Sequence, residues 1–179
     1  MESSFETERL IARRWVASDL DDLAEMYGDM RVMRFLGPVP KIYSRDEVVE
    51  ILERRLTKQV DWLPSRGSWA VLEKETGKFL GVTLAQEFPE GMGAPEVEVG
   101  YHFAFPAWGN GYATEICRAT IRHIFELEPD FKTLYAVAFT ENTPSLNVLR
   151  KSGMEFIGET TRFYNETLST FVLSRDQLS

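Results

Sequence analysis

The sequence predicts a single domain of mixed α/β (α+β) class over residues 1–179. Stretches with apolar residues at helical spacing alternate along the chain with runs typical of β-strands. Glycine and proline signals separate these stretches, and no internal repeat, low-complexity tract or linker interrupts them. The hydrophobic fraction of 44% and the charged fraction of 27% are those of a globular chain that buries one core.

The N-terminal third predicts one strand followed by two helices. Residues 9–15, RLIARRW, have the pattern of a strand. Ser18 is expected to begin a helix, because apolar residues follow it at helical spacing. Residues 28–43 predict a short helical turn and a proline-broken loop. Ser44 and Glu47 then form the capping box S-x-x-E of a helix that should end near residue 59.

The middle of the chain predicts a β region and a long helix. Residues 67–74 and 78–88 are expected to form two strands joined by a hairpin turn at ETG. Residues 95–105 predict a third strand with alternating residue types. Residues 112–127 predict an amphipathic helix, because apolar side chains share one side of it and charged side chains share the other.

The C-terminal third predicts a strand, a short helix and two closing strands. Residues 133–139 are expected to form a buried strand. Residues 140–154 predict a helix with proline in its first turn and glycine at its end. The last strands are expected at residues 154–160 and 168–173. The predicted order is therefore β-α-α-β-β-β-α-β-α-β-β, with helices crossing over the later strands.

Charge and composition argue against several function classes. The formal net charge is −8 and no run of five basic residues occurs, which disfavours direct nucleic-acid binding. An acidic surface suits a basic partner such as an amine, and solubility alone explains it as well. One cysteine and two histidines leave no basis for a disulfide or for a cysteine or histidine metal site. No membrane span or signal core is visible, so a cytoplasmic location is expected.

The most informative segment is FPAWGNGYATE at residues 105–115, where a strand is followed by two glycines and a helix. Such a turn directs backbone N–H groups and the positive end of the helix dipole to one place, and glycine leaves room for an anion. The alternative is a tight turn without a ligand. A dinucleotide fingerprint is excluded because Thr114 stands where a third small residue is needed. A nucleotide P-loop is excluded because no lysine follows the glycines.

Four segments in the right order resemble the GCN5-related N-acetyltransferase (GNAT) superfamily, in particular its ribosomal-protein N-terminal (alanine/serine) acetyltransferase branch. Residues 108–113 (WGNGYA) are similar to the loop Q/R-x-x-G-x-G/A, with tryptophan in the first place. Residues 98–101 (EVGY) resemble the strand just upstream. Residues 141–154 resemble E-N-x-x-S-x-x-V-x-x-K-x-G-F, and residues 8–13 resemble the opening T-E-R-L-x-L-R. The match runs from about residue 6 to residue 173.

The resemblance implies the GNAT fold and acetyl-CoA as cosubstrate. The implied sheet is mixed and mostly antiparallel, with six to seven strands, about four helices, and the family's strands 4 and 5 splayed around the cofactor. The backbone at 103–105 would pair with the pantetheine arm as an added strand, and the amides at 109–114 would hold the pyrophosphate. The implied cofactor-binding residues are Phe103, Ala104, Phe105, Trp108, Gly109, Asn110, Gly111, Tyr112, Ala113, Thr114, Asn142 and Ser145.

The implied reaction is direct attack of an amine on the thioester, without a metal. Glu98 is the candidate base, acting directly or through water, although a carboxylate on a strand also commonly faces solvent. Ser145 or Tyr101 is the candidate acid for the leaving thiolate, and capping a helix is the alternative role of Ser145. His102 shares the face of Glu98 and is expected to be structural or to line the substrate site. Cys117, on the apolar side of its helix, is expected to be an inert core thiol.

The expected acceptor is the N-terminal α-amine of a protein or peptide. With a pKa near 7.7–8.0, deprotonation at pH 7 costs about 1 kcal/mol, against roughly 4–5 kcal/mol for a lysine side chain. The branch resemblance favours the same acceptor. Small-molecule amines and antibiotics are alternative acceptors, and a non-catalytic acyl-CoA-binding domain is an alternative function. The final hairpin, residues 154–173, is expected to shape the acceptor site or a homodimer contact.

Overall fold

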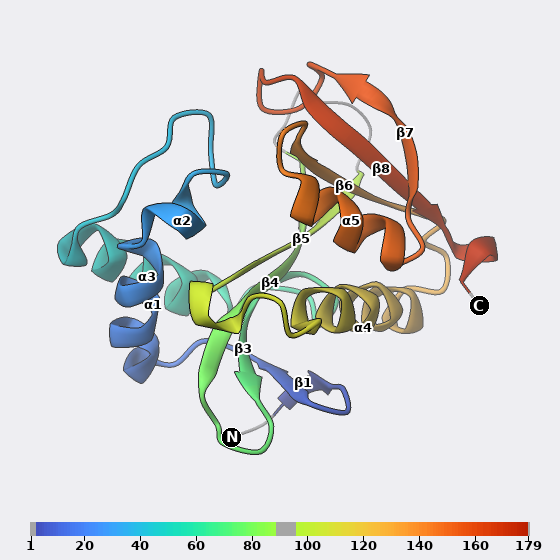
Figure 1. Cartoon of the computed structure of the whole chain (residues 1–179). Coiled ribbons are helices and arrows are strands. Elements are labelled where there is room, and N and C mark those ends of the chain that lie inside the picture. The colour runs from blue at the N-terminus through green and yellow to red at the C-terminus, as the bar shows by residue number, and fades with distance from the viewer. Residues whose placement is uncertain (1–2, 89–95, 179) are drawn as a thin grey trace.

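A computed structural model describes residues 3–88 and 96–178 of the chain. Its strands form one sheet in the order β1-β2-β3-β4-β5-β6-β8-β7, with helices on both faces (Figure 1). The strands are β1 (Ser3–Glu6), β2 (Leu10–Arg13), β3 (Gly67–Glu73), β4 (Phe79–Glu87), β5 (Val97–Phe103), β6 (Thr133–Phe139), β7 (Glu155–Thr160) and β8 (Leu168–Ser174). The α-helices are α1 (Leu20–Tyr27), α2 (Met30–Met33), α3 (Arg45–Lys58), α4 (Tyr112–Leu127) and α5 (Thr143–Lys151).

The predicted mixed class and the mostly antiparallel sheet are confirmed, with two corrections. The described residues form eight strands rather than six to seven, and five α-helices rather than about four. The strand that sequence patterns missed is β1, which has only four residues and only one apolar side chain, Phe5. It is ordered by antiparallel pairing with β2, a contact that no local pattern encodes.

The start of α1 also differs from the prediction, because Ser18 does not begin this helix. Ser18 lies in a short 3₁₀ helix at Ala17–Asp19, and α1 begins at Leu20. The neighbouring Asp19 is buried and accepts hydrogen bonds from both Nη atoms of Arg13, at 2.8 and 2.5 Å. A buried carboxylate needs such a partner, so this ion pair fixes the start of α1 more strongly than a serine cap would.

Apolar side chains pack on both faces of the sheet. On one face, α4 places Ile116, Ile121 and Phe125 against β-strand residues that include Val99 and Phe103. On the other face, helices α1 and α3 pack over β3 and β4, with the buried residues Leu23, Met26, Val48, Leu52 and Val82. Figure 1 shows β5 running between the α1–α3 group and the pair α4 and α5. Strand β5 therefore has side chains that reach both helical layers.

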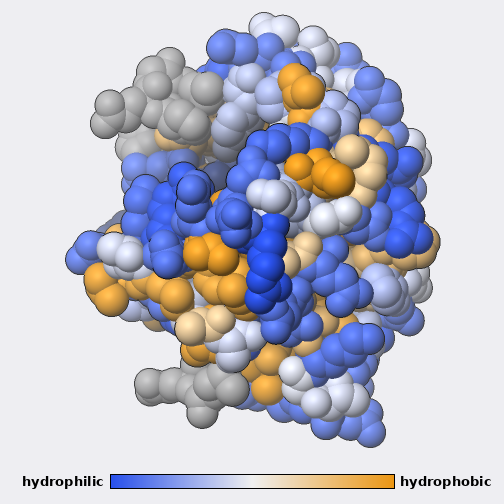
Figure 2. Space-filling view, turned by 90° about the vertical axis from the view of Figure 1, so that its left-hand side faces the viewer, coloured by the Kyte–Doolittle hydropathy of each residue, from blue (hydrophilic) through white to orange (hydrophobic). Residues whose placement is uncertain are grey.

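The surface on the side of α1 to α3 is predominantly hydrophilic, with hydrophobic surface in separate patches (Figure 2). Exposed apolar side chains include Val39, Ile42, Val60 and Leu63. Within residues 3–88 and 96–178, no helix combines the length and the hydrophobicity needed to cross a bilayer.

The sheet opens between β5 and β6, its one parallel neighbouring pair in the described chain. Only Val97 with Leu134 and Glu98 with Tyr135 are paired there. Beyond Glu98, β5 continues to Phe103 paired only with β4, while β6 continues to Phe139 paired with β8. The two strands therefore separate after Glu98, which leaves one backbone edge of β5 without a strand partner.

The predicted capping box of α3 is confirmed and gives a direct stability test. The Ser44 amide donates to Glu47 Oε2 at 2.8 Å, and the Glu47 amide donates to Ser44 Oγ at 3.4 Å. Replacing Ser44 with alanine is expected to reduce the free energy of unfolding by about 1 kcal/mol. The matched Ser18→Ala change should cost less than about 0.5 kcal/mol, because Ser18 is exposed and does not cap α1. Urea unfolding of both variants checks the difference, and equal losses would contradict it.

Candidate active site

The open edge of β5 is defined by the hydrogen bonds of its last residues. The Ala104 amide donates to the Leu80 carbonyl at 2.9 Å, so Ala104 directs its backbone toward β4. Because successive strand residues direct their N–H and C=O groups to opposite sides, those of Phe103, Tyr101 and Val99 face the gap beside β6. The Phe103 carbonyl accepts a hydrogen bond from the Trp108 indole N–H at 2.8 Å. Tryptophan in the first loop position therefore has a structural role.

The expected cofactor edge at residues 103–105 spans the end of β5 and the start of a 3₁₀ helix. Phe105 begins a 3₁₀ helix, Phe105–Ala107, and its carbonyl accepts the Trp108 amide at 3.1 Å. The Ala104 carbonyl likewise accepts the Ala107 amide at 2.9 Å. The carbonyls of Ala104 and Phe105 and the Ala104 amide thus have partners within the chain. The part of β5 without a strand partner on this side runs from Val99 to Phe103.

The glycine loop lies between this edge and α4. Gly109 and Gly111 both have a φ of +79°, a left-handed conformation that costs a residue with a side chain about 1–2 kcal/mol. A Cβ at Gly109 would meet no atom within 4 Å, and Gly111 is the N-cap of α4 without a side-chain cap. In the described chain, no carbonyl accepts a hydrogen bond from the Gly109 or Gly111 amide. Open space, unsatisfied N–H donors and a helix N-terminus therefore fit a phosphate group.

An arginine from the β1–β2 hairpin braces the glycine loop. Arg9 Nη1 donates to the Asn110 carbonyl at 3.0 Å, Arg9 Nε donates to Glu115 at 2.7 Å, and the guanidinium lies 4.7 Å from the centroid of the Tyr112 ring. Burial pushes the pKa of Glu115 up, but hydrogen bonds from Thr7 and Arg9 outweigh it and keep that pKa below the usual value. Arg9 and Glu115 lie 106 residues apart, in the segments 8–13 and 105–115. No other feature of the sequence connects the two residues.

Glu98 lies where β5 and β6 separate. Its side chain is 9% exposed and accepts hydrogen bonds from the Tyr164 hydroxyl, at 2.5 Å, and from Gln86 Nε2, at 3.5 Å. Burial raises the pKa of the Glu98 carboxyl, and these two hydrogen bonds partly oppose the rise. A buried carboxyl with a raised pKa, located where the two strands separate, is suited to accept a proton from an amine. No sequence motif pointed to Tyr164.

Tyr101 and Ser145 meet on the opposite face of β5. The Tyr101 hydroxyl lies 3.1 Å from Ser145 Oγ and donates to the Ser145 carbonyl, also at 3.1 Å. Burial raises the pKa of Tyr101 well above its usual value, so the phenol keeps its proton. Asn142 Oδ1 accepts the Ser145 amide at 3.3 Å and caps α5. The cap uses the Ser145 amide, which leaves the Ser145 hydroxyl beside Tyr101.

His102 faces α1, and Cys117 lies in the core on the Tyr101 side of the sheet. His102 Nε2 lies 2.9 Å from the Tyr27 hydroxyl of α1, and burial, followed by the charge of Arg55, lowers the pKa of His102 to about 3. A histidine that remains neutral in a packed contact is structural. Cys117 is 1% exposed in the core, and burial raises the pKa of its thiol to about 11. Its inert position agrees with the expectation from the sequence.

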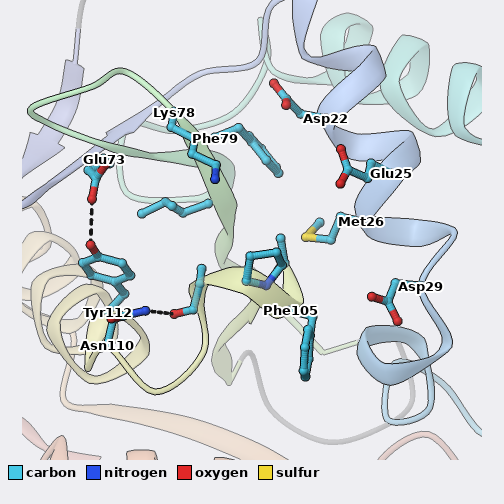
Figure 3. Close-up of a pocket in the computed structure, with 14 residues that line it drawn as sticks. Asp22, Glu25, Met26, Asp29, Glu73, Lys78, Phe79, Phe105, Asn110 and Tyr112 are labelled. Atoms are coloured by element: carbon cyan, nitrogen blue, oxygen red, sulfur yellow. Dashed lines mark hydrogen bonds between the residues drawn. The ribbon is translucent and has the colours of Figure 1, made fainter.

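A cavity of about 230 Å³ lies next to the glycine loop, on the side of α1 (Figure 3). Asn110 and Tyr112 line it, and the Tyr112 hydroxyl donates to Glu73 at 2.8 Å. Its charged lining consists of one lysine and four acids: Lys78, Asp22, Glu25, Asp29 and Glu73. Because carboxylates repel phosphate oxygens, this cavity does not suit a pyrophosphate. The three candidate catalytic side chains do not line it.

The amino-acid sequence of the chain is similar to those of known proteins. The acetyltransferase (GNAT) domain family matches residues 9–155. The uncharacterized protein YkkB of Bacillus subtilis (strain 168) is 35% identical over 105 residues, which cover 58% of this chain and 58% of YkkB. The uncharacterized N-acetyltransferase p20 of Bacillus licheniformis is 26% identical over 146 residues, which cover 80% of this chain and 77% of p20.

Two solved structures of low sequence identity share the fold. Ribosomal-protein-S5-alanine acetyltransferase from Vibrio fischeri has a TM-score of 0.75 and 18% identity, over 100% of both chains. Spermidine N-acetyltransferase from Vibrio cholerae, solved with CoA and spermine, has a TM-score of 0.74 and 14% identity, over 96% of this chain and 99% of its own. The names of these two proteins differ in the amine they specify, so the shared fold leaves the acceptor open.

Proposed function

The chain belongs to the acetyltransferase (GNAT) domain family, and on that basis we propose that it transfers an acetyl group from acetyl-CoA to the N-terminal α-amine of a protein or peptide. One observation carries the proposal. The sheet opens directly after Glu98, with Glu98 on one face of the opening and the pair Tyr101 and Ser145 on the other. The acceptor amine could thus lose its proton to Glu98 on one face, while the leaving group takes up a proton on the other.

The residues present fit acetyl-CoA at two places. The edge from Val99 to Phe103 has no strand partner, and its backbone donors and acceptors, apart from the Phe103 carbonyl that accepts the Trp108 indole, could pair with an amide-bearing arm. The loop at Gly109 and Gly111, held in place by Arg9, has the open N–H groups for a pyrophosphate. Acetyl-CoA, when bound, supplies an acetyl group activated as a thioester. The β5 edge borders the gap where β5 leaves β6, and the glycine loop follows that edge along the chain.

Glu98 is proposed to accept the proton of the incoming amine. An α-ammonium group has a pKa near 7.7–8.0, so its proton is removed at a cost of about 1 kcal/mol at pH 7. Burial raises the pKa of Glu98 toward that of the amine, which improves the match between the two groups. The position of Glu98 at the mouth of the gap would also limit the access of water to the deprotonated amine.

The Tyr101 hydroxyl is proposed to hold the proton that the departing sulfur takes up, with Ser145 as its hydrogen-bond partner. Its distances of 3.1 Å to both oxygens of Ser145 fix the phenol beside the N-terminus of α5. The positive end of that helix dipole also favours negative charge at this point. Asn142, which caps α5, keeps Ser145 in position.

A direct assay distinguishes the proposed acceptor from the small amine suggested by the spermidine acetyltransferase fold neighbour. The protein is incubated with acetyl-CoA and three acceptors: a lysine-free peptide, an N-terminally blocked peptide with one lysine, and spermidine. Mass spectrometry should find acetyl on the α-amine of the first peptide. Acetylation of spermidine alone would replace the proposed acceptor by a small amine. Binding of acetyl-CoA without any transfer would favour a non-catalytic domain.

A further inference from the structure

The turn between β7 and β8 brings an unusual residue to Glu98. The Glu166 amide closes the turn by donating to the Phe163 carbonyl at 3.3 Å. Between them, Tyr164 and Asn165 have φ values of 57° and 56°, the left-handed pair of a tight type I′ turn. Among the described residues, these two are the only ones with a side chain and a positive φ. Asparagine adopts this conformation readily, whereas tyrosine does so at an energetic cost.

Three contacts hold the strained turn over the start of β5. The Phe163 ring, 1% exposed, stacks on Phe88 with centroids 4.0 Å apart. Arg162 pairs with Glu96 at 3.0 Å. The Tyr164 hydroxyl donates to Glu98 Oε2 at 2.5 Å. A strained backbone persists where surrounding contacts determine it, and such strain concentrates at functional sites.

We propose that Tyr164 is a positioning residue for acetyl transfer, whose hydroxyl orients the Glu98 carboxylate toward the opening between β5 and β6 and keeps it in the form that accepts a proton. This inference rests on the proposed function of Glu98. Within the described chain, both hydrogen bonds that Glu98 accepts go to Oε2. Oε1 is therefore the oxygen that is left for the amine.

The chemistry of the contact supports this role. A hydrogen bond donated to a carboxylate stabilises its ionised form, and it does so more strongly where burial removes water. Burial and the Glu98 charge raise the pKa of Tyr164, so the phenol remains a donor over the working pH range. Without this donor, Glu98 would be a buried carboxyl with only the longer contact from Gln86 to favour ionisation.

The test compares Tyr164→Phe with the wild type and with Tyr135→Phe as a matched control. Tyr135 lies opposite Glu98 in the parallel pair, and its hydroxyl interacts with Glu96 instead. A hydrogen bond to a charged group contributes enough to move the pKa of Glu98 by about one unit. Tyr164→Phe should therefore shift the acid limb of the kcat/KM profile upward and reduce activity below that limb about tenfold. The high-pH plateau should stay within about threefold, and Tyr135→Phe should follow the wild type.

Carbon-13 NMR titration of the Glu98 carboxyl, assigned by its absence in Glu98→Gln, provides a second readout that needs no turnover. An upward shift of about one unit in the midpoint for Tyr164→Phe alone supports the inference. An active wild type with an unmoved midpoint, or equal loss of activity at every pH, would overturn the inference and leave the proposed function intact. A wild type that acetylates no amine while the midpoint still moves would refute the proposed function, and with it the catalytic part of this inference.

Discussion

Replacing Gly111 with glutamate is expected to weaken acetyl-CoA binding at least about 100-fold. The φ of +79° at Gly111 is unfavourable for any residue with a side chain, at a cost of about 1–2 kcal/mol. A carboxylate at this N-cap would also stand where the loop presents its open N–H groups to phosphate, and like charges cost several kcal/mol when they meet at an interface. The backbone strain is present with and without ligand and mainly lowers stability, so the repulsion is the term that must reach the roughly 2.7 kcal/mol that a 100-fold change requires.

Isothermal titration calorimetry with acetyl-CoA measures this loss. Gly153→Glu is the matched control, because Gly153 has a φ of +89°, has no atom near its would-be Cβ, and lies just after α5. It introduces the same charge and a similar backbone strain, so it should bind acetyl-CoA like the wild type. Equal affinity of both variants and the wild type would show that the glycine loop does not hold the pyrophosphate.

Glu98→Gln is expected to lower kcat about 10²–10⁴-fold while leaving the affinity for acetyl-CoA unchanged. The loss is that of a general base, because glutamine accepts the Tyr164 hydrogen bond but cannot take the amine proton. Unchanged affinity follows because Glu98 belongs to neither the β5 backbone edge nor the glycine loop. Glu87→Gln, the same change at an exposed position of β4, should retain wild-type activity. Stopped-time assays of acetyl transfer compare the wild type with the two variants. A fully active Glu98→Gln would show that another group is the base.

The same change should increase stability at neutral pH. The folded protein binds the Glu98 proton more tightly than the unfolded chain, because the folded pKa is raised above the ordinary value of 4.5. Wild-type stability therefore falls as pH rises from 4.5 through the raised pKa, and the amide variant lacks that loss. Thermal unfolding at several pH values should show Glu98→Gln melting above the wild type, with a difference that grows with pH. A constant difference would contradict the assigned direction of the pKa shift.

Local patterns in the sequence predict the elements whose residues supply their own signals. The α4 helix occupies residues 112–127 as expected, since its apolar stripe and preceding glycine fix both its face and its start. The Ser44 capping box is likewise a contact within one turn. The predicted start of α1 at Ser18 is wrong because the buried pair of Arg13 and Asp19 joins two elements, and such tertiary contacts override a local cap.

The candidate site shows the same limit. Glu98, Tyr101 and Ser145 were identified from the sequence because they lie in segments with a recognised spacing. Tyr164 was missed because it reaches Glu98 across 66 residues, from a turn without any motif. The hydrogen bonds of Ala104 and Phe105 could not be predicted either. The strand predicted over residues 95–105 ends at Phe103, and a 3₁₀ helix begins at Phe105.

The burial of Cys117 determines how this protein is best assayed. Because the thiolate is the reactive form, a thiol that is 1% exposed with a pKa of about 11 should scarcely react with a chromogenic disulfide reagent. Acetyl transfer releases coenzyme A with a free thiol, so the same reagent would record turnover continuously against almost no protein background. Since Cys117 is the single cysteine, any slow additional reaction would report unfolding. A single thiol assay could then distinguish an inactive variant from a misfolded one.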